Sequence, residues 1–267
     1  RNRQERGLDE LHIVFVPQAP SIEYGERLFT GSHESWRLHN MLIPSCWLLP
    51  SCKNISACSS RSEAEIIEKK LATNIFPKKY SVATPIAHHH TGWPIIAGHL
   101  GYNLQCLTAS EQAKNYAQQW IDEHSGGKKT IALTLREATF TPKRNSDVGE
   151  WVRFARLLQE NGYFPVILRD IETALDEPPA EFEGIATFSE GVFNLELRMA
   201  FYEQCYMSAF VSNGPSTPCY YGNTARYLYF VTGEYLHEEP TAFNRIGLGR
   251  GTTPPFANHY QRWLWFD

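Results

Sequence analysis

The sequence lacks the features of a helical membrane protein and of a nucleic-acid-binding protein. No window approaches the roughly 20 consecutive apolar residues that a transmembrane helix needs, and no N-terminal apolar stretch behind positive charge marks a secretory signal. Lysine and arginine form no dense run, and the formal net charge is −4, which argues against an extended nucleic-acid surface. We therefore expect neither an integral membrane span nor a nucleic-acid partner.

Cysteine pairs of the kind that bind zinc or carry redox chemistry are also missing. The six cysteines contain no CxxC pair, and the even spacing of Cys46, Cys52 and Cys58 matches no zinc site. This usage is typical of reduced, buried thiols, so we expect a cytoplasmic protein.

Size and composition are those of a globular chain. The 267 residues allow one large domain or two small ones, and 42% hydrophobic with 20% charged residues is ordinary for such proteins. The aromatic share of 13% is high, and these rings can serve either the core or a cleft that faces a sugar.

The second half of the chain alternates short apolar runs, which predict strands, with amphipathic segments, which predict helices. Strands are expected at 130–135, 163–168, 185–188, 209–211 and 227–231, and helices at 148–161 and 195–206. Such alternation implies a parallel sheet with right-handed crossovers.

The first half is less regular, with strands expected at 11–16 and 54–58 and helices at 35–49, 62–71 and 109–124. The segment 125–129 is small, flexible and polar, and it lies between a helix and a strand. We therefore predict an α/β protein with an N-terminal domain over residues 1–124 and a C-terminal domain over residues 125–267.

The strand at 130–135 ends on groups suited to a phosphate. It runs into Arg136 and is followed by Arg144, Asn145 and Ser146. Ligands of open α/β sheets bind at the carboxyl ends of the strands, and the guanidinium fork suits phosphate oxygens. We expect Arg136, Arg144 and Asn145 to bind an anion such as a diphosphate. The alternative is an ion pair between Arg136 and an acid, namely Glu137, Asp170 or Glu190.

A second strand, ending at Val211, leads into the turn 212–218. Gly214 permits backbone conformations closed to other residues, while Ser216 and Thr217 offer hydroxyl and backbone donors. We expect Asn213, Gly214, Ser216 and Thr217 to hold the same ligand. An ordinary strand-to-helix turn would use the same residues.

Histidines and one glutamate are the candidate general bases. Adjacent histidines on a strand point to opposite faces and no carboxylate stands at ligand spacing, so the run 88–90 predicts no metal site; His89 instead suits a base or a hydrogen-bond donor in a cleft. His33 and Glu34 lie where a cleft would face the second domain, and general-base work needs such a group near the acceptor hydroxyl. A carboxylate at a helix N-terminus is the alternative role for Glu34.

Residues 130–235 resemble the donor-binding half of glycosyltransferases of the two-domain GT-B architecture. The turn Val211-Ser-Asn-Gly-Pro-Ser216 is similar to the Asp-Thr-Gly-Pro turn of heptosyltransferase-like members, and fucosyltransferases also place an arginine at a strand end, against the donor diphosphate. The other matching positions are Thr134-Leu-Arg136, Arg144-Asn-Ser146, Trp151, Gly162-Tyr163 and Asp170.

This resemblance implies two Rossmann-like domains whose parallel sheets face a cleft. It implies transfer of a sugar from a nucleotide-diphosphate sugar to a hydroxyl acceptor, without metal or cofactor. Arg136, Arg144 and the turn 213–217 would neutralise the leaving diphosphate, and Glu34, His33 or His89 would deprotonate the acceptor. A nucleotide-sugar epimerase or hydrolase, and a binding module without catalytic activity, remain alternatives.

Overall fold

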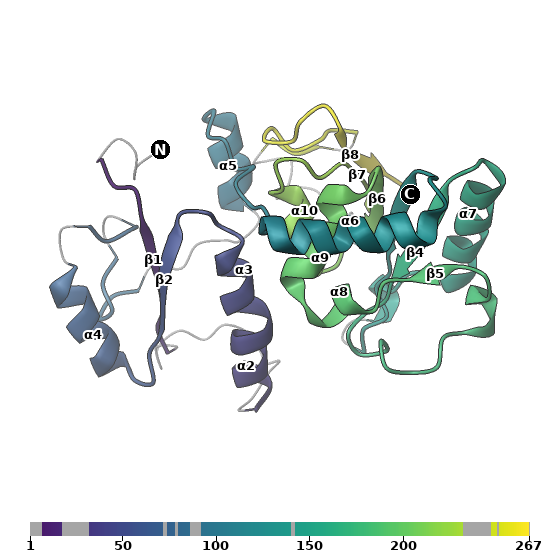
Figure 1. Ribbon diagram of the computed structural model, residues 1–267. Coiled ribbons are helices and arrows are strands. Elements are labelled where there is room, and N and C mark those ends of the chain that lie inside the picture. Colours follow the sequence, from purple (N-terminus) through teal and green to yellow (C-terminus); the bar gives the residue numbers. More distant parts are fainter. Residues whose placement is uncertain are drawn as a thin grey trace. The chain divides into compact units, whose positions relative to one another are not determined.

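The computed structural model describes residues 7–17, 32–71, 74–77, 80–85, 92–139, 142–231, 247–249 and 251–266. The contacts between residues divide the chain into two compact units, Arg1–Trp93 and Pro94–Asp267. Figure 1 labels the helices and strands of both units.

The first unit contains a βαβ arrangement. Strands β1 (Leu11–Phe15) and β2 (Cys52–Ala57) pair in parallel, with Ile13 opposite Ile55. Between them lie α2 (Ser32–Arg37), the π-helical turn η1 (Leu38–Leu42) and α3 (Ile43–Trp47), and α4 (Arg61–Lys70) follows β2. Pro44 lies in the first turn of α3, where the N–H that proline lacks is not needed.

The second unit is built on a six-stranded parallel sheet in the order β5-β4-β3-β6-β7-β8. In chain order within the unit this is 3-2-1-4-5-6, the order of a Rossmann-like fold. The strands are β3 (Thr130–Thr134), β4 (Phe164–Leu168), β5 (Ala186–Thr187), β6 (Met207–Val211), β7 (Tyr227–Val231) and β8 (Gln261–Trp265). This confirms the predicted α/β class and parallel sheet.

One face of this sheet packs against α7 (Val148–Glu160). Alternate side chains of β3, including Leu133, point to this face and meet Trp151 and Ala155 of the helix. In the centre Leu133 lies between Ile167 on β4 and Ala209 on β6. The helix begins at the N-cap Asp147, whose carboxylate accepts from the Glu150 N–H at 3.1 Å.

The other face is covered by α6 (Glu111–Ser125) and α9 (Leu195–Gln204), which run side by side (Figure 1). Trp120 of α6 makes edge contacts with Phe188 and Phe201, whose rings stack with centroids 4.3 Å apart. On the same face Thr134 of β3 hydrogen-bonds the hydroxyl of Tyr202 at 2.8 Å. The remaining helices of the unit are α5 (Gly92–His99), which begins at the division, the four-residue α8 (Glu190–Phe193) and α10 (Thr217–Tyr220).

The division between the units lies earlier in the chain than the predicted boundary. Helix α6 ends at Ser125, and Gly126 is its left-handed C-cap with φ +57°. The buried carboxylate of Glu203 on α9 accepts hydrogen bonds from the Ala109 N–H and the Thr108 hydroxyl, both at 2.9 Å. The segment before α6 therefore belongs to the second unit.

A Rossmann-like sheet is seen in the second unit only, as far as the described residues show; the first unit contributes the β1–β2 pair. No helix in the described parts of the chain combines the length and apolar character that a membrane span requires.

Candidate anion-binding site

The candidate site lies where the strand order of the sheet reverses. Strand β3 has β4 on one side and β6 on the other, and the chain reaches β6 only after it has built β4 and β5. In open α/β sheets, ligands bind outside the carboxyl ends of the strands at such a switch point. Arg136 follows β3 here, and Ser212 and Asn213 follow β6.

The loop after β3 is closed by a reciprocal pair of hydrogen bonds. The Arg136 N–H donates to Ser146 Oγ at 2.9 Å, and the Ser146 N–H donates to the Arg136 carbonyl at 2.8 Å. Ser146 is buried, so its hydroxyl is held inside the protein. This pair fixes the start of the loop against its end and thereby fixes the direction in which Arg136 leaves the strand.

Asn145 secures the guanidinium itself. Its Oδ1 accepts from Arg136 Nη1 and from the Ala138 N–H, and its Nδ2 donates to the Ala138 carbonyl at 2.9 Å. Both ends of this amide are used within the loop. Asn145 therefore orients Arg136, while its direct contact with a phosphate stays a prediction.

Arg144 joins the two loops of the switch point. Its Nη2 donates to Ser212 Oγ at 2.8 Å, so the loop after β3 is tied to the turn after β6. Burial lowers the pKa of Arg136, and the nearby charge of Arg144 lowers it further, while Asp170 and Glu172 oppose this effect. Two guanidinium groups close enough to repel each other form a site that an anion stabilises.

The turn after β6 is braced by its own side chains. Asn213 Oδ1 accepts from the Ser216 N–H at 2.8 Å, and the Ser216 hydroxyl donates to the Asn213 carbonyl at 3.0 Å. Ser216 is fully buried, so it shapes the turn from within, whereas Gly214 and Thr217 are exposed. The Asn213 Nδ2 atom is buried and meets no acceptor within the described parts of the chain. A buried amide without an acceptor is the kind of group that a ligand satisfies.

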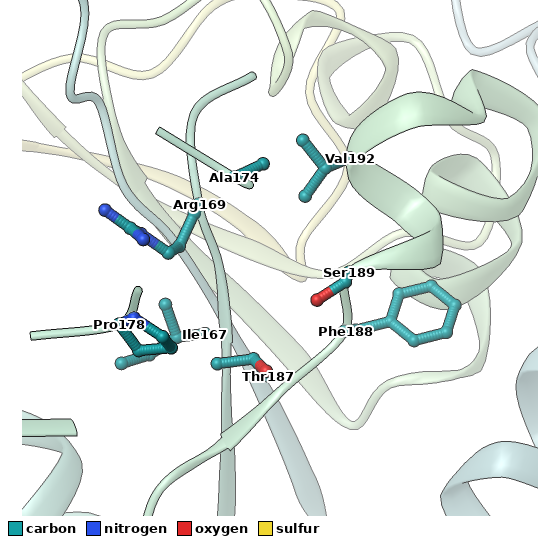
Figure 2. Close-up of a pocket in the computed structure, with 8 residues that line it drawn as sticks. All are labelled: Ile167, Arg169, Ala174, Pro178, Thr187, Phe188, Ser189 and Val192. Atoms are coloured by element: carbon teal, nitrogen blue, oxygen red, sulfur yellow. The ribbon is translucent and has the colours of Figure 1, made fainter. Parts of the chain in front are cut away.

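A small pocket opens at the carboxyl ends of β4 and β5, on the β4 side of the switch point (Figure 2). Arg169 at the end of β4 is bound to Glu137 by an ion pair of 2.8 Å, and both side chains are largely buried. Glu137 thus pairs with Arg169 rather than with Arg136. The lining residues are Ile167, Arg169, Ala174, Pro178, Thr187, Phe188, Ser189 and Val192.

The structure brings the predicted phosphate-binding residues together in the two loops of the switch point. The candidate bases belong to the first unit. Glu34 is exposed on α2 of the first unit. His33 is also in α2, but its side chain lies outside the described residues, as does His89. Groups of three or more His, Cys, Asp or Glu that could hold a metal ion are absent from the described part of the chain.

Three further residues take part in the site through contacts that were not predicted, although Ser146 was already named among the groups that follow the strand at 130–135. Ser212 accepts from Arg144 and so joins the two loops, Ser146 closes the loop after β3, and Arg169 lines the pocket. All three follow a strand or precede a helix at the same edge of the sheet, so their positions were a usable signal. The hydrogen-bond partners of these residues could not be predicted, because residues that meet only in the folded chain show no fixed spacing in the sequence.

The comparisons with known proteins find likeness in structure alone. The sequence matches no protein-family profile, and no curated protein matches it. The glycosyl transferase family 9 protein of Veillonella parvula DSM 2008 is similar over 60% of this chain and 42% of its own, at 15% identity and a TM-score of 0.44. The ADP-heptose LPS heptosyltransferase II of E. coli is similar over 59% and 44%, at 16% identity and a TM-score of 0.39.

The chain spans less than half the length of either solved structure. At these identities the likeness concerns the fold only. The resemblance to heptosyltransferase-like GT-B proteins, expected from residues 130–235, is thus found again as a distant structural similarity to glycosyltransferase family 9.

Proposed function

We propose that the protein is a glycosyltransferase that moves a sugar from a nucleotide-diphosphate sugar to a hydroxyl acceptor without a metal ion. The observation that carries this proposal is the pairing of Arg136 and Arg144 at the switch point. Both are oriented by hydrogen bonds from the loops, and the buried Nδ2 of Asn213 follows the neighbouring strand. Their charge and geometry suit a diphosphate.

The proposed chemistry uses this charge at the moment when the sugar leaves. The acceptor oxygen attacks the anomeric carbon, the bond from that carbon to the phosphate oxygen breaks, and the nucleoside diphosphate departs with the bonding electrons. Negative charge grows on the departing oxygen, where guanidinium groups held in place beforehand stabilise it. The fixed positions of Arg136 and Arg144 support this role.

The pocket at β4 and β5 is the proposed place for the nucleoside. It lies along the same edge of the sheet as the arginines, one strand away from β3. Ala174, Pro178 and Val192 give it apolar walls, and Thr187 and Ser189 add hydroxyls (Figure 2). Apolar walls with a few polar groups are typical of pockets for small molecules.

The residues that we propose to act on the acceptor belong to the first unit. We propose Glu34, His33 or His89 as the base that takes the proton from the acceptor hydroxyl, and a second Rossmann-like domain in the N-terminal part of the chain as its support. A base of this kind must come within hydrogen-bond reach of the hydroxyl. Replacing each residue singly and measuring transfer would identify it.

A binding module without transferase activity is the second candidate. The exposure of Glu34 favours it, because catalytic carboxylates are usually tuned by burial and neighbours. An epimerase or hydrolase on the same fold is a further alternative. Product analysis separates the three, since the sugar is transferred, released or isomerised, or stays on the nucleotide.

The test is a ligand screen followed by an assay of turnover. UDP, GDP, ADP, CMP and their sugar conjugates are screened by thermal shift, because a ligand that binds only the folded state stabilises it by roughly 2.7 kcal/mol at a hundredfold excess over Kd. The nucleotide sugar that binds is then incubated with a panel of hydroxyl acceptors. Binding with transfer supports the proposal, binding without transfer favours the module, and no binding by any nucleotide rejects both.

A further inference from the structure

Arg198 places a full positive charge inside the second unit. It lies in α9 and is 2% exposed. Arginine stays protonated in proteins, yet no carboxylate pairs with Arg198 among the described residues. Buried charges are normally paired because the interior solvates them poorly, so an unpaired guanidinium at this depth calls for a reason.

The partners of Arg198 are neutral oxygens, namely two backbone carbonyls that follow β4 and β5 and one tyrosine hydroxyl of the same helix. Its Nε donates to the Gly191 carbonyl at 2.6 Å, its Nη2 lies 3.4 Å from the Arg169 carbonyl, and its Nη1 lies 3.4 Å from the Tyr202 hydroxyl. That hydroxyl bonds Thr134, the last residue of β3, at 2.8 Å. Arg198 therefore links β3, the end of β4 and helix α8 after β5.

These contacts border the pocket at the same edge. Arg169 lines the pocket (Figure 2), and in the sequence Gly191 of α8 lies between the lining residues Ser189 and Val192. Arg198 thus donates to the backbone carbonyl of Arg169, which lines the pocket, and to that of Gly191, which lies between two lining residues.

Two largely buried acids of the unit, Glu203 and Glu137, have other partners. Glu203, further along α9, accepts from Thr108, Ala109 and Thr224 and lies 4.0 Å from Lys114. Glu137 is paired with Arg169. A buried charge is screened much less by salt than a surface charge, so the field of Arg198 extends to the edge of the sheet where the candidate site lies.

We propose that Arg198 is a positioning and electrostatic residue for the diphosphate group of the ligand. It acts through the walls that it holds and through its unpaired charge, without touching the ligand. This inference rests on the proposed nucleotide-diphosphate site. It goes beyond that site by assigning part of the anion affinity to a residue on the covered face of the sheet.

The test compares a charged ligand with its uncharged parent. Affinities of one nucleoside diphosphate (UDP, GDP or ADP, whichever binds the wild type) and of its nucleoside are measured by calorimetry or by competition. Arg198→Gln removes the charge but keeps a donor for the carbonyls, Arg198→Met removes both, and Arg198→Lys keeps the charge. Circular dichroism and thermal melting establish that each variant is folded.

We expect Arg198→Gln to weaken the diphosphate about tenfold more than the nucleoside, the size that Coulomb's law gives for unit charges roughly 10 Å apart at an effective dielectric constant of about 20. Arg198→Lys should keep the wild-type ratio of the two affinities. A purely structural residue would lower both affinities alike, so an unchanged ratio in the neutral variants overturns the proposal.

Failure of both neutral variants to fold would assign Arg198 to folding alone and would also overturn it. Absence of nucleotide binding in the wild type is a different result. It would reject the proposed function itself.

Discussion

The side-chain oxygen of Asn213 serves the fold, and we assign its side-chain nitrogen to the candidate site. Its Oδ1 is committed to the Ser216 N–H, which shapes the turn after β6. Its Nδ2 is buried and has no acceptor among the described residues. Leaving a buried donor unsatisfied costs roughly 1–3 kcal/mol, and an anion that accepts from this group removes the cost. The residue is therefore stabilised by the ligand that we propose.

Asn213→Asp should weaken anion binding and spare the fold. The substitution keeps an oxygen for the Ser216 N–H but replaces the buried donor by negative charge. We expect a loss of about tenfold or more in the affinity for a nucleoside diphosphate, as for a lost hydrogen bond to a charged group. Calorimetry checks this. The control is Asn161→Asp at the C-cap of α7, whose amide bonds only the Leu157 carbonyl, and equal effects at both positions would contradict the assignment.

At the scale of elements, helix α10, its C-cap and strand β7 carry tyrosines whose burial raises their pKa. Burial raises the pKa of Tyr221, the C-cap, to about 12, and it raises the pKa values of Tyr220 and Tyr227 well above the ordinary value. The hydroxyls therefore keep their protons in the folded state at a pH where the unfolded chain has lost them. This favours the unfolded state in alkaline solution, because only there can the tyrosines ionise.

The free energy of unfolding should begin to fall above about pH 9, where the buried thiols of Cys205 and Cys219 ionise only in the unfolded chain. It should fall more steeply from about pH 10, the ordinary pKa of tyrosine, to about pH 12. Each unit of pKa difference contributes about 1.4 kcal/mol. Urea denaturation across this pH range, followed with tyrosinate absorbance, measures both the loss and its source. Tyr221→Phe should reduce the loss. A flat profile above pH 10 would contradict the burial of these rings.

The elements of the sheet could be predicted where a signal is local. Strand 227–231 is found at the expected residues, and 130–135 and 163–168 differ from β3 and β4 by one residue. Strand β8 was not predicted, because its first residue, Gln261, looks polar and exposed in the sequence. In the structure this side chain is fully buried and donates to the Gly222 and Ala225 carbonyls. Contacts so distant along the chain leave no periodic pattern.

The candidate site, like the sheet, could be predicted only where a signal is local in the sequence. Arg136 and the turn 213–217 were found because strand ends are visible in the sequence. The division of roles between Arg136, which is oriented, and Asn145, which orients it, depends on a hydrogen bond within the folded loop. The boundary after residue 124 stays a prediction, because glycines after a helix signal a cap and a linker equally well.

At the scale of the whole molecule, the second unit contains a complete sheet with both faces covered. Helix α6 supplies part of that cover, since Trp120 packs on Phe188 and Phe201, which are fully buried. The unit Pro94–Asp267 therefore contains the parts that its own core requires. A piece that starts after α6 would expose these rings to water.

A fragment of residues 94–267 should fold cooperatively and bind a nucleoside diphosphate, whereas a fragment of residues 125–267 should not. Removing α6 uncovers aromatic surface, and burial of apolar surface contributes about 25 cal/mol per Å². Thermal unfolding and tryptophan fluorescence distinguish the two fragments. Cooperative folding of the shorter fragment would restore the boundary at residue 125 and contradict the arrangement described above.

The most direct measurement is the affinity of the wild type, Arg136→Ala and Arg144→Ala for UDP, GDP and ADP. Arg153→Ala is the matched control, because this arginine is exposed on α7 and pairs only with Glu150 among the described residues. If the two arginines hold the diphosphate, one nucleotide binds the wild type and the control alike. Each site variant then loses roughly tenfold or more, as for a charge-assisted hydrogen bond. Equal affinities in all four folded proteins, or no nucleotide binding in any, would contradict the central claim.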